Sequence, residues 1–137
     1  AKLLAHMELY EHGKMMVSWL RREDFIEAGI GNDSDLDLIN LLRETAGVEV
    51  AILLYEIAGD GPKSHSVKVS LRTTSPHNAL DLVAKLGGGG HKRAAGCSSA
   101  ATIDEAKHKV VATAERAFFH YTGDTVAIRR DDIGGPL

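Results

Sequence analysis

The chain has little of several features that mark particular protein classes. Cys97 is its single cysteine, so the chain holds no internal disulfide and no cysteine-rich zinc site, which fits a reducing, cytoplasmic setting. Its seven histidines are scattered without metal-ligand spacing, and no H-E-x-x-H motif occurs. No apolar run approaches the roughly 18 residues of a membrane span. We therefore expect a cytoplasmic protein with no membrane partner.

Length and composition are those of an ordinary globular domain. The chain has 137 residues, of which 44% are hydrophobic and 26% charged. A chain of this length can bury roughly two-thirds of the surface that its unfolded form exposes. We expect one domain with one continuous hydrophobic core.

The net charge of −3 is unevenly distributed along the chain. Residues 61–100 hold six cations and one acid, whereas the remainder holds ten cations and eighteen acids. A protein that coats nucleic acid would be basic throughout, so we interpret this pattern as a local pocket for a small or terminal phosphate. Chance clustering of charge on a solvated face remains the alternative.

The basic segment contains four consecutive glycines, Gly87–Gly90, followed by His91, Lys92 and Arg93. Glycines leave backbone N–H groups open to a ligand, and the imidazole and two cations that follow add positive charge. This combination predicts an anion site. The spacing matches neither a Walker A loop nor the dinucleotide fingerprint. A flexible surface linker is the alternative interpretation.

Hydrophobic periodicity predicts alternating strands and helices, and hence an α/β fold. We expect a single domain with a mixed sheet of four or five strands and helices packed on it, including one antiparallel pair across a turn at 59–62. An edge strand at 125–129 is an open alternative. The expected strands are 15–20, 48–58, 67–72 and 94–99, and the expected helices are 3–10, 22–28, 33–46, 75–86 and 102–118.

Local signals refine these elements. Ser75 and Pro76 are typical of an N-cap and a first helical residue, and Thr102–Glu105 forms a capping box. Alternation in the 67–72 strand directs Arg72 away from the core, where its guanidinium can bind a phosphate through two parallel bonds. We expect His77 to be a surface residue and Cys97 a partly buried strand residue.

The stretch Val67–Arg72, the helix after it and the motif Gly-Gly-Gly-His-Lys-x-Ala-Ala-Gly at 88–96 carry a family resemblance. They resemble the C-terminal, DHH-associated substrate-binding domain of DHH-family phosphoesterases, of the oligoribonuclease, 3'-phosphoadenosine phosphatase and cyclic-dinucleotide phosphodiesterase type. The resemblance extends over most of 14–118. Residues 1–13 are then expected to end an interdomain linker helix, and 119–137 to form a C-terminal tail.

The resemblance also implies what lies outside this chain. Enzymes of the family carry a separate N-terminal domain in which an Asp-His-His triplet helps to hold two divalent metals, for which we expect manganese. No Asp-His-His occurs here, so we expect a fragment that is inactive alone, with no catalytic residue, metal ligand or cofactor of its own.

The resemblance implies that this domain holds the phosphate and base of a short RNA, short DNA or nucleotide substrate while the DHH domain hydrolyses it. Whether Lys92 and Arg93 contact the ligand or face solvent is left open. The residues expected to bind substrate are Arg72, Gly88, Gly89, Gly90, His91, Lys92 and Arg93.

Two other functions remain open. Related glycine-rich domains end alanyl-tRNA synthetases, so the chain can be interpreted as a nucleic-acid-binding module without hydrolase activity. It can also be interpreted as an oligomerisation domain, for instance of a homodimer. His91-Lys92 and the ending Ala94-Ala95-Gly96 favour the phosphoesterase group.

Overall fold

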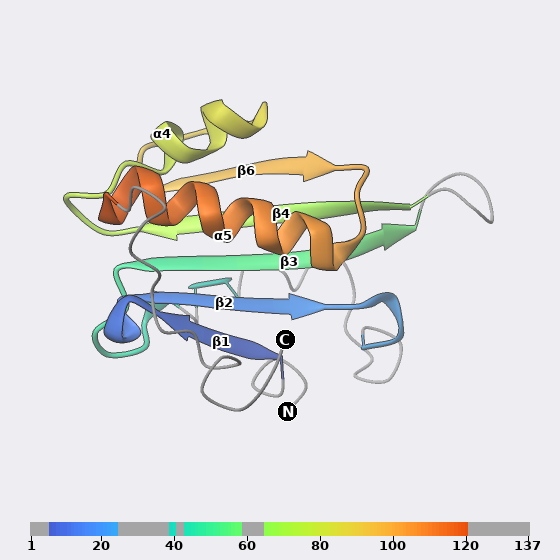
Figure 1. Ribbon diagram of the computed structural model, residues 1–137, viewed down its shortest axis with the longest axis horizontal. Coiled ribbons are helices and arrows are strands. Elements are labelled where there is room, and N and C mark those ends of the chain that lie inside the picture. Colours follow the sequence, from blue (N-terminus) through green and yellow to red (C-terminus); the bar gives the residue numbers. More distant parts are fainter. Residues whose placement is uncertain (1–5, 25–38, 41–42, 59–64, 121–137) are drawn as a thin grey trace.

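A computed structural model of the chain describes residues 6–24, 39–40, 43–58 and 65–120. Within them, six strands form one sheet in the order β1-β2-β3-β4-β6-β5 (Figure 1). The α/β class with a mixed sheet is confirmed, but the strand number exceeds the expected four or five because two short edge strands were not predicted. The strands are β1 (Met7–Tyr10), β2 (Met15–Leu20), β3 (Val50–Ala58), β4 (His65–Thr73), β5 (Gly89–Gly90) and β6 (Ala94–Ser99).

The long helix α5 (Ile103–Phe119) crosses one face of the sheet, and the shorter α4 (Ala79–Val83) lies on the same side near β6 (Figure 1). Two 3-10 turns, η1 (Glu11–Gly13) and η3 (Ala84–Leu86), also lie within the described residues. The predicted cap of α5 is confirmed, since Thr102 Oγ1 accepts the Glu105 N–H at 3.2 Å.

β3 lies in the middle of the sheet, which explains its unbroken apolar sequence. It pairs in parallel with β2 and antiparallel with β4, from Val50 opposite Thr73 to Ala58 opposite His65. Both of its alternations are buried, because hydrophobic groups cover both faces of the sheet at this strand. The predicted antiparallel pair is thus confirmed, although the turn at 59–62 lies outside the described residues.

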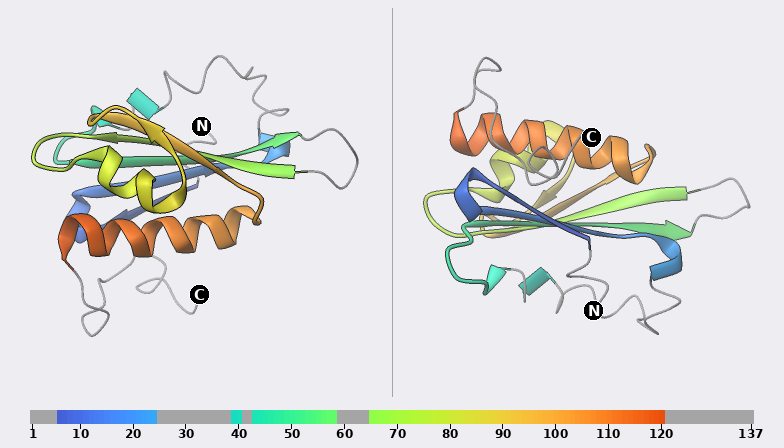
Figure 2. Two further views of the ribbon diagram at one scale, coloured as in Figure 1. Left: turned by 90° about the horizontal axis from the view of Figure 1, so that it is seen from above. Right: turned by 60° about the horizontal axis from the view of Figure 1, so that its bottom comes forward.

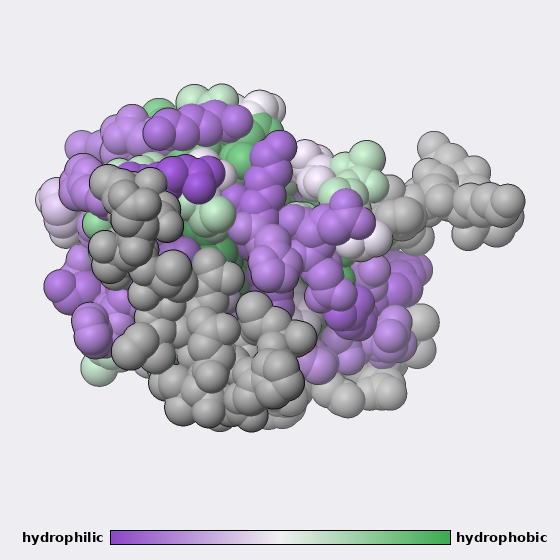
Figure 3. Space-filling view, in the orientation of Figure 1, coloured by the Kyte–Doolittle hydropathy of each residue, from purple (hydrophilic) through white to green (hydrophobic). Residues whose placement is uncertain are grey.

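The two faces of the sheet carry separate clusters of buried side chains. On the α5 face, Val67, Val69 and Leu71 pack with the inner side of α5, as the alternation of this strand predicted. On the opposite face, Leu53 and Ile39 belong to a second cluster. Figure 2 shows the segment at 39–40 on that side of the sheet. Hydrophilic colouring dominates the outer surface around α5 (Figure 3).

The helix expected over 3–10 is wrong for Met7–Tyr10, which forms strand β1 antiparallel to β2. Met7 and Leu9 turn to one face of the sheet, and Glu8 and Tyr10 turn to the other and are buried. This alternation has the period of a strand, but four residues are too few to separate it from a helical pattern. Residues 1–5 lie outside the described part.

The helix expected to begin at Ser75–Pro76 begins later, at Ala79. The Ser75–Pro76 peptide bond is cis, and the N-cap is Asn78, whose side chain accepts the Leu80 N–H at 3.0 Å. Gly87, with φ of +79°, ends the following 3-10 turn as predicted.

Other predicted elements lie partly or wholly outside the described residues. Of the expected helices 22–28 and 33–46, only 22–24, 39–40 and 43 are described as helical, and 125–129 is not described. In the described ranges, no helix is long and apolar enough to cross a membrane.

Candidate functional site

The glycine run forms part of a β-hairpin, which argues against its interpretation as a free linker. His91 and Ala94 exchange both backbone hydrogen bonds, at 2.7 and 3.2 Å, and enclose a two-residue tip made by Lys92 and Arg93. β5 precedes this tip and β6 follows it, and the two strands pair with Gly90 opposite Ala95. We call residues 89–99 the β5–β6 hairpin.

Gly88 is required for packing. Its N–H donates to the Val83 carbonyl oxygen at 2.7 Å, so this amide is already used inside the protein. A Cβ at this position would overlap the carbonyl oxygen of Gly96 and the Cβ of Cys97. Because this amide is bonded to α4 and packed against β6, the geometry argues against its binding a phosphate.

Gly90 differs from its neighbours in the direction of its amide. In an antiparallel ladder, hydrogen-bonded and non-hydrogen-bonded pairs alternate. Because His91 and Ala94 form a hydrogen-bonded pair, Gly89–Gly96 is the next such pair, and the Gly90 N–H points away from β6. β5 is the last strand of the described sheet, so this N–H lies along the sheet edge. Its φ of +141° also requires glycine.

Strand register brings Arg72 and His91 to the same face of the sheet. Arg72 on β4 lies opposite Ala94 on β6, and Ala94 lies opposite His91. Directly opposed residues share a face, which here is the face away from α5. Their backbones are about 10 Å apart, two strand spacings, with only the Ala94 methyl between them. The row Arg72–Ala94–His91 thus has a cation at one end and an imidazole at the other.

The two side chains of this row differ in exposure. His91 is exposed, and Arg72 is half-buried, with Nη1 donating to the Leu71 carbonyl oxygen at 3.0 Å. A guanidinium has five N–H donors, and Arg72 makes a further interaction within the protein besides this bond. The row can therefore combine a partly ordered guanidinium with an imidazole that a ligand can reach.

The two cations at the hairpin tip have different surroundings. The Lys92 side chain is exposed, while its carbonyl oxygen accepts the Ala79 N–H at 2.7 Å and the Thr73 hydroxyl at 3.1 Å. Arg93 is half-buried, and its Nη1 donates to the His77 carbonyl oxygen at 2.6 Å. Lys92 is free to meet a ligand, whereas Arg93 joins the hairpin to the loop before α4.

His77 is buried, with 9% of its surface exposed, so the expectation of a surface residue is wrong. Its Nε2 lies 2.8 Å from Glu49 Oε1, and its ring packs against Phe118 and Phe119 at centroid distances of 5.3 and 5.2 Å. Glu49 and the two phenylalanines are remote in sequence, so no local pattern could have found this contact.

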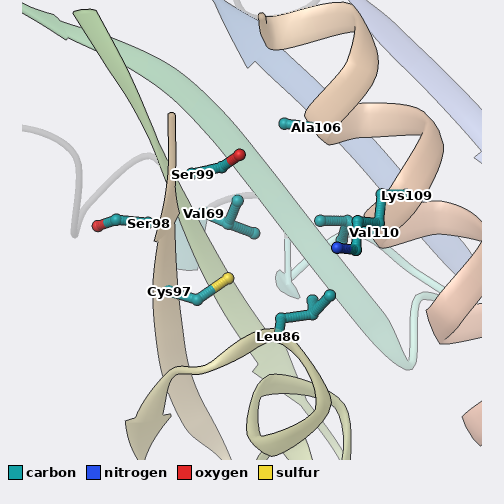
Figure 4. A pocket seen from close by; sticks show the side chains of 8 residues that line it. All are labelled: Val69, Leu86, Cys97, Ser98, Ser99, Ala106, Lys109 and Val110. Atoms are coloured by element: carbon teal, nitrogen blue, oxygen red, sulfur yellow. The ribbon is translucent and has the colours of Figure 1, made fainter. Parts of the chain in front are cut away.

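A small cleft on the α5 face is separate from this row (Figure 4). Cys97 projects its sulfur into the cleft, and burial raises the pKa of its thiol, as suits a partly buried strand residue. None of the residues predicted to bind substrate lines it. The lining residues are Val69, Leu86, Cys97, Ser98, Ser99, Ala106, Lys109 and Val110.

The described residues contain no group of three or more His, Cys, Asp or Glu side chains that could hold a metal ion. The metal expected in a preceding domain remains a prediction.

A comparison with known families decides the family of this chain. Residues 13–118 match the model of the DHHA1 domain. The chain belongs to the DHHA1 family. The resemblance stated from the 88–96 motif is thereby confirmed.

This DHHA1 chain is similar to a curated protein, the bifunctional oligoribonuclease and PAP phosphatase NrnA of Thermus thermophilus. The two are 33% identical over 103 residues, which cover 74% of this chain and 29% of NrnA. The chain thus spans less than a third of that relative.

Two solved structures share the fold. An exopolyphosphatase-related protein from Bacteroides fragilis matches with a TM-score of 0.65 and 24% identity, over 87% of this chain and 32% of the other. The pGpG-specific phosphodiesterase PggH from Vibrio cholerae matches with a TM-score of 0.50 and 18% identity, over 82% and 36%. At these identities the likeness shows only that the folds are shared.

Proposed function

We propose that this DHHA1 domain binds the phosphate and base of a short oligonucleotide or dinucleotide and presents it to a metal-bearing DHH domain of the same protein. The row Arg72–Ala94–His91 carries this proposal. A guanidinium and an imidazole stand about two strand spacings apart on a surface without bulky side chains between them. The outward Gly90 N–H adds a donor at the adjacent edge.

Each group has a distinct part in this proposal. The Arg72 guanidinium forms charge-assisted hydrogen bonds to a phosphate, and the Gly90 amide, which points outward at the sheet edge, donates to a different acceptor of the ligand. His91 contacts the phosphate or the base, and the methyl of Ala94 allows a flat base to approach the sheet. Lys92 adds positive charge near the tip, and Gly88 acts by keeping the start of the hairpin close to α4.

The relatives support the substrate class. NrnA is described as an oligoribonuclease and PAP phosphatase, and PggH as a pGpG-specific phosphodiesterase. A short nucleotide substrate with a phosphate end is common to these descriptions. In the complete protein, the divalent metals of the DHH domain would polarise the phosphate ester, while this domain would supply binding and orientation.

The proposal is tested by titrating this chain with the dinucleotide pApA. Arg72→Ala and His91→Ala should each weaken binding about thirtyfold, since loss of one charged contact removes roughly 2 kcal/mol. Lys68→Ala is the matched control, because Lys68 is an exposed cation on the same strand and face, four residues from Arg72. It should change the affinity by less than about threefold if its distance from the row leaves only screened attraction.

Binding that is unchanged within about twofold in both row variants would contradict the proposal, as would a wild-type chain that binds no pApA at millimolar concentration. Removing the 5'-phosphate from the probe should weaken binding to wild type and matter much less to Arg72→Ala. Unfolding curves of all variants check that the folded state is retained.

A further inference from the structure

We propose that His77 is a positioning residue for the β5–β6 hairpin, acting through Arg93 and making no contact with the ligand. This inference rests on the proposed function for its ligand-binding consequence only. A chain of contacts through His77 leads from the start of β3 and the end of α5 to the predicted binding row.

The first contact fixes the His77 ring. Its Nε2 is 2.8 Å from Glu49 Oε1, and Glu49 is the residue directly before β3, the central strand. The Thr74 N–H donates to the Glu49 carbonyl oxygen at 2.9 Å, and the His77 N–H donates to the Thr74 carbonyl oxygen at 3.0 Å. The loop at 74–78 is thus tied to the start of β3 by both its backbone and the imidazole.

The second contact is with two aromatic rings. Phe118 and Phe119, at the end of α5, lie 5.3 and 5.2 Å from the His77 ring centroid in tilted arrangements. Tilted ring pairs at such distances are favourable beyond the area they bury. The ring therefore joins α5 to a loop that contains no regular secondary structure.

The third contact passes from this loop to the hairpin. The His77 carbonyl oxygen accepts Arg93 Nη1 at 2.6 Å, a short charge-assisted bond. Arg93 is one of the two tip residues of the hairpin. His91 precedes the tip and Ala94 follows it. The His77 carbonyl thus helps to hold Arg93, together with the Thr73 N–H, which donates to the Arg93 carbonyl oxygen at 3.0 Å. Through the tip, we expect it to influence the orientation of His91 in the row.

His77 lies outside both the glycine motif and the row Arg72–Ala94–His91. It is buried, touches neither Arg72 nor His91 in the contacts described, and belongs to a loop rather than to the glycine motif. A leucine at this position would keep the apolar contacts to the phenylalanines but lose the bond to Glu49. We expect the loop to shift and the Arg93 bond to weaken.

The direct test is amide hydrogen exchange without ligand. His77→Leu should speed exchange at Ala94 N–H, which bonds to the His91 carbonyl oxygen, more than it speeds exchange in β3. Val111→Ala is the control, because Val111 is buried on α5 about two turns before Phe118 and its loss destabilises the core. It should raise exchange only through the lower global stability.

The second readout is affinity for pApA. His77→Leu should weaken binding about tenfold, His77→Gln should recover part of the loss because its amide can donate to Glu49, and Val111→Ala should leave the affinity of the folded fraction unchanged. Arg93→Gln should weaken binding by a similar factor. Combining it with His77→Leu should weaken binding little further, because both substitutions act on the same chain of contacts.

The outcomes separate the two proposals. Exchange at Ala94 that rises no more in His77→Leu than in Val111→Ala would overturn the positioning role, whether or not pApA binds. A wild-type chain that fails to bind pApA, with faster Ala94 exchange in His77→Leu, would overturn the proposed function and leave the positioning role standing. If His77→Leu does not fold, Arg93→Gln carries the same two measurements, because Arg93 lies half-buried at the surface.

Discussion

Gly87–Gly89 and Gly90–Lys92 are adjacent in the sequence, but their surroundings differ. In the first segment, the Gly88 N–H is bonded to Val83, and a side chain at 88 would meet β6. In the second, the Gly90 N–H points away from the sheet, and His91 and Lys92 are exposed. One glycine-rich motif thus contains positions needed for packing and positions that are exposed at the sheet edge.

The glycines of the run are not equally required by the structure. Close approach of the backbone to Gly96 and Cys97 requires glycine at 88, and the backbone conformation requires it at 90. Gly89 has nothing within 4 Å of an added Cβ and no such backbone requirement. Substitutions along the run should therefore have very different effects on stability.

The largest expected effect is that of Gly88→Ala on folding. The added Cβ would overlap backbone atoms, which cannot rotate away, so the free energy of unfolding should fall by about 2 kcal/mol or more. Gly89→Ala is the matched control and should change it by less than about 0.5 kcal/mol. Urea unfolding measures both, and similar losses in the two variants would contradict the assignment of Gly88 to packing.

A smaller effect concerns Cys97, whose Cβ faces the position of Gly88. Burial raises the pKa of the Cys97 thiol, so this thiol should react with iodoacetamide more slowly at pH 8 than an exposed cysteine. Gly88→Ala should speed the reaction, because the hairpin can no longer pack closely, whereas Gly89→Ala should not. Equal rates in the wild type and in a cysteine peptide would contradict this packing.

The raised pKa also fixes the sign of a pH effect on stability. As pH rises, the thiol of the unfolded chain ionises first, so the folded state binds more protons and stability falls between the ordinary thiol pKa and the folded one. Cys97→Ser should lack this part of the pH dependence in urea unfolding curves.

Much of the fold could be predicted because its signals are local. The alternation of Val67, Val69 and Leu71, and the capping box at Thr102, each lie within a few consecutive residues. The central position of β3 could be predicted from its lack of alternation. Strand β1 was missed because four residues carry too little periodicity to outweigh a helical interpretation.

The sequence predicts which residues belong to the candidate site, but it does not predict how they are arranged. The motif named Arg72 and the 88–93 segment, yet strand register decides which amide faces outward and which side chains share a face. Register depends on pairing between residues remote in sequence. The same holds for His77, whose partner Glu49 precedes it by 28 residues.

The most direct test of the account follows backbone amide signals while pApA is added to this chain. The account predicts large, saturable shifts at Gly90 and His91, with little change at Gly88, whose N–H stays bonded to Val83. Equal shifts at Gly88 and Gly90, or no shifts at either at millimolar pApA, would contradict the division of the glycine run on which the account depends.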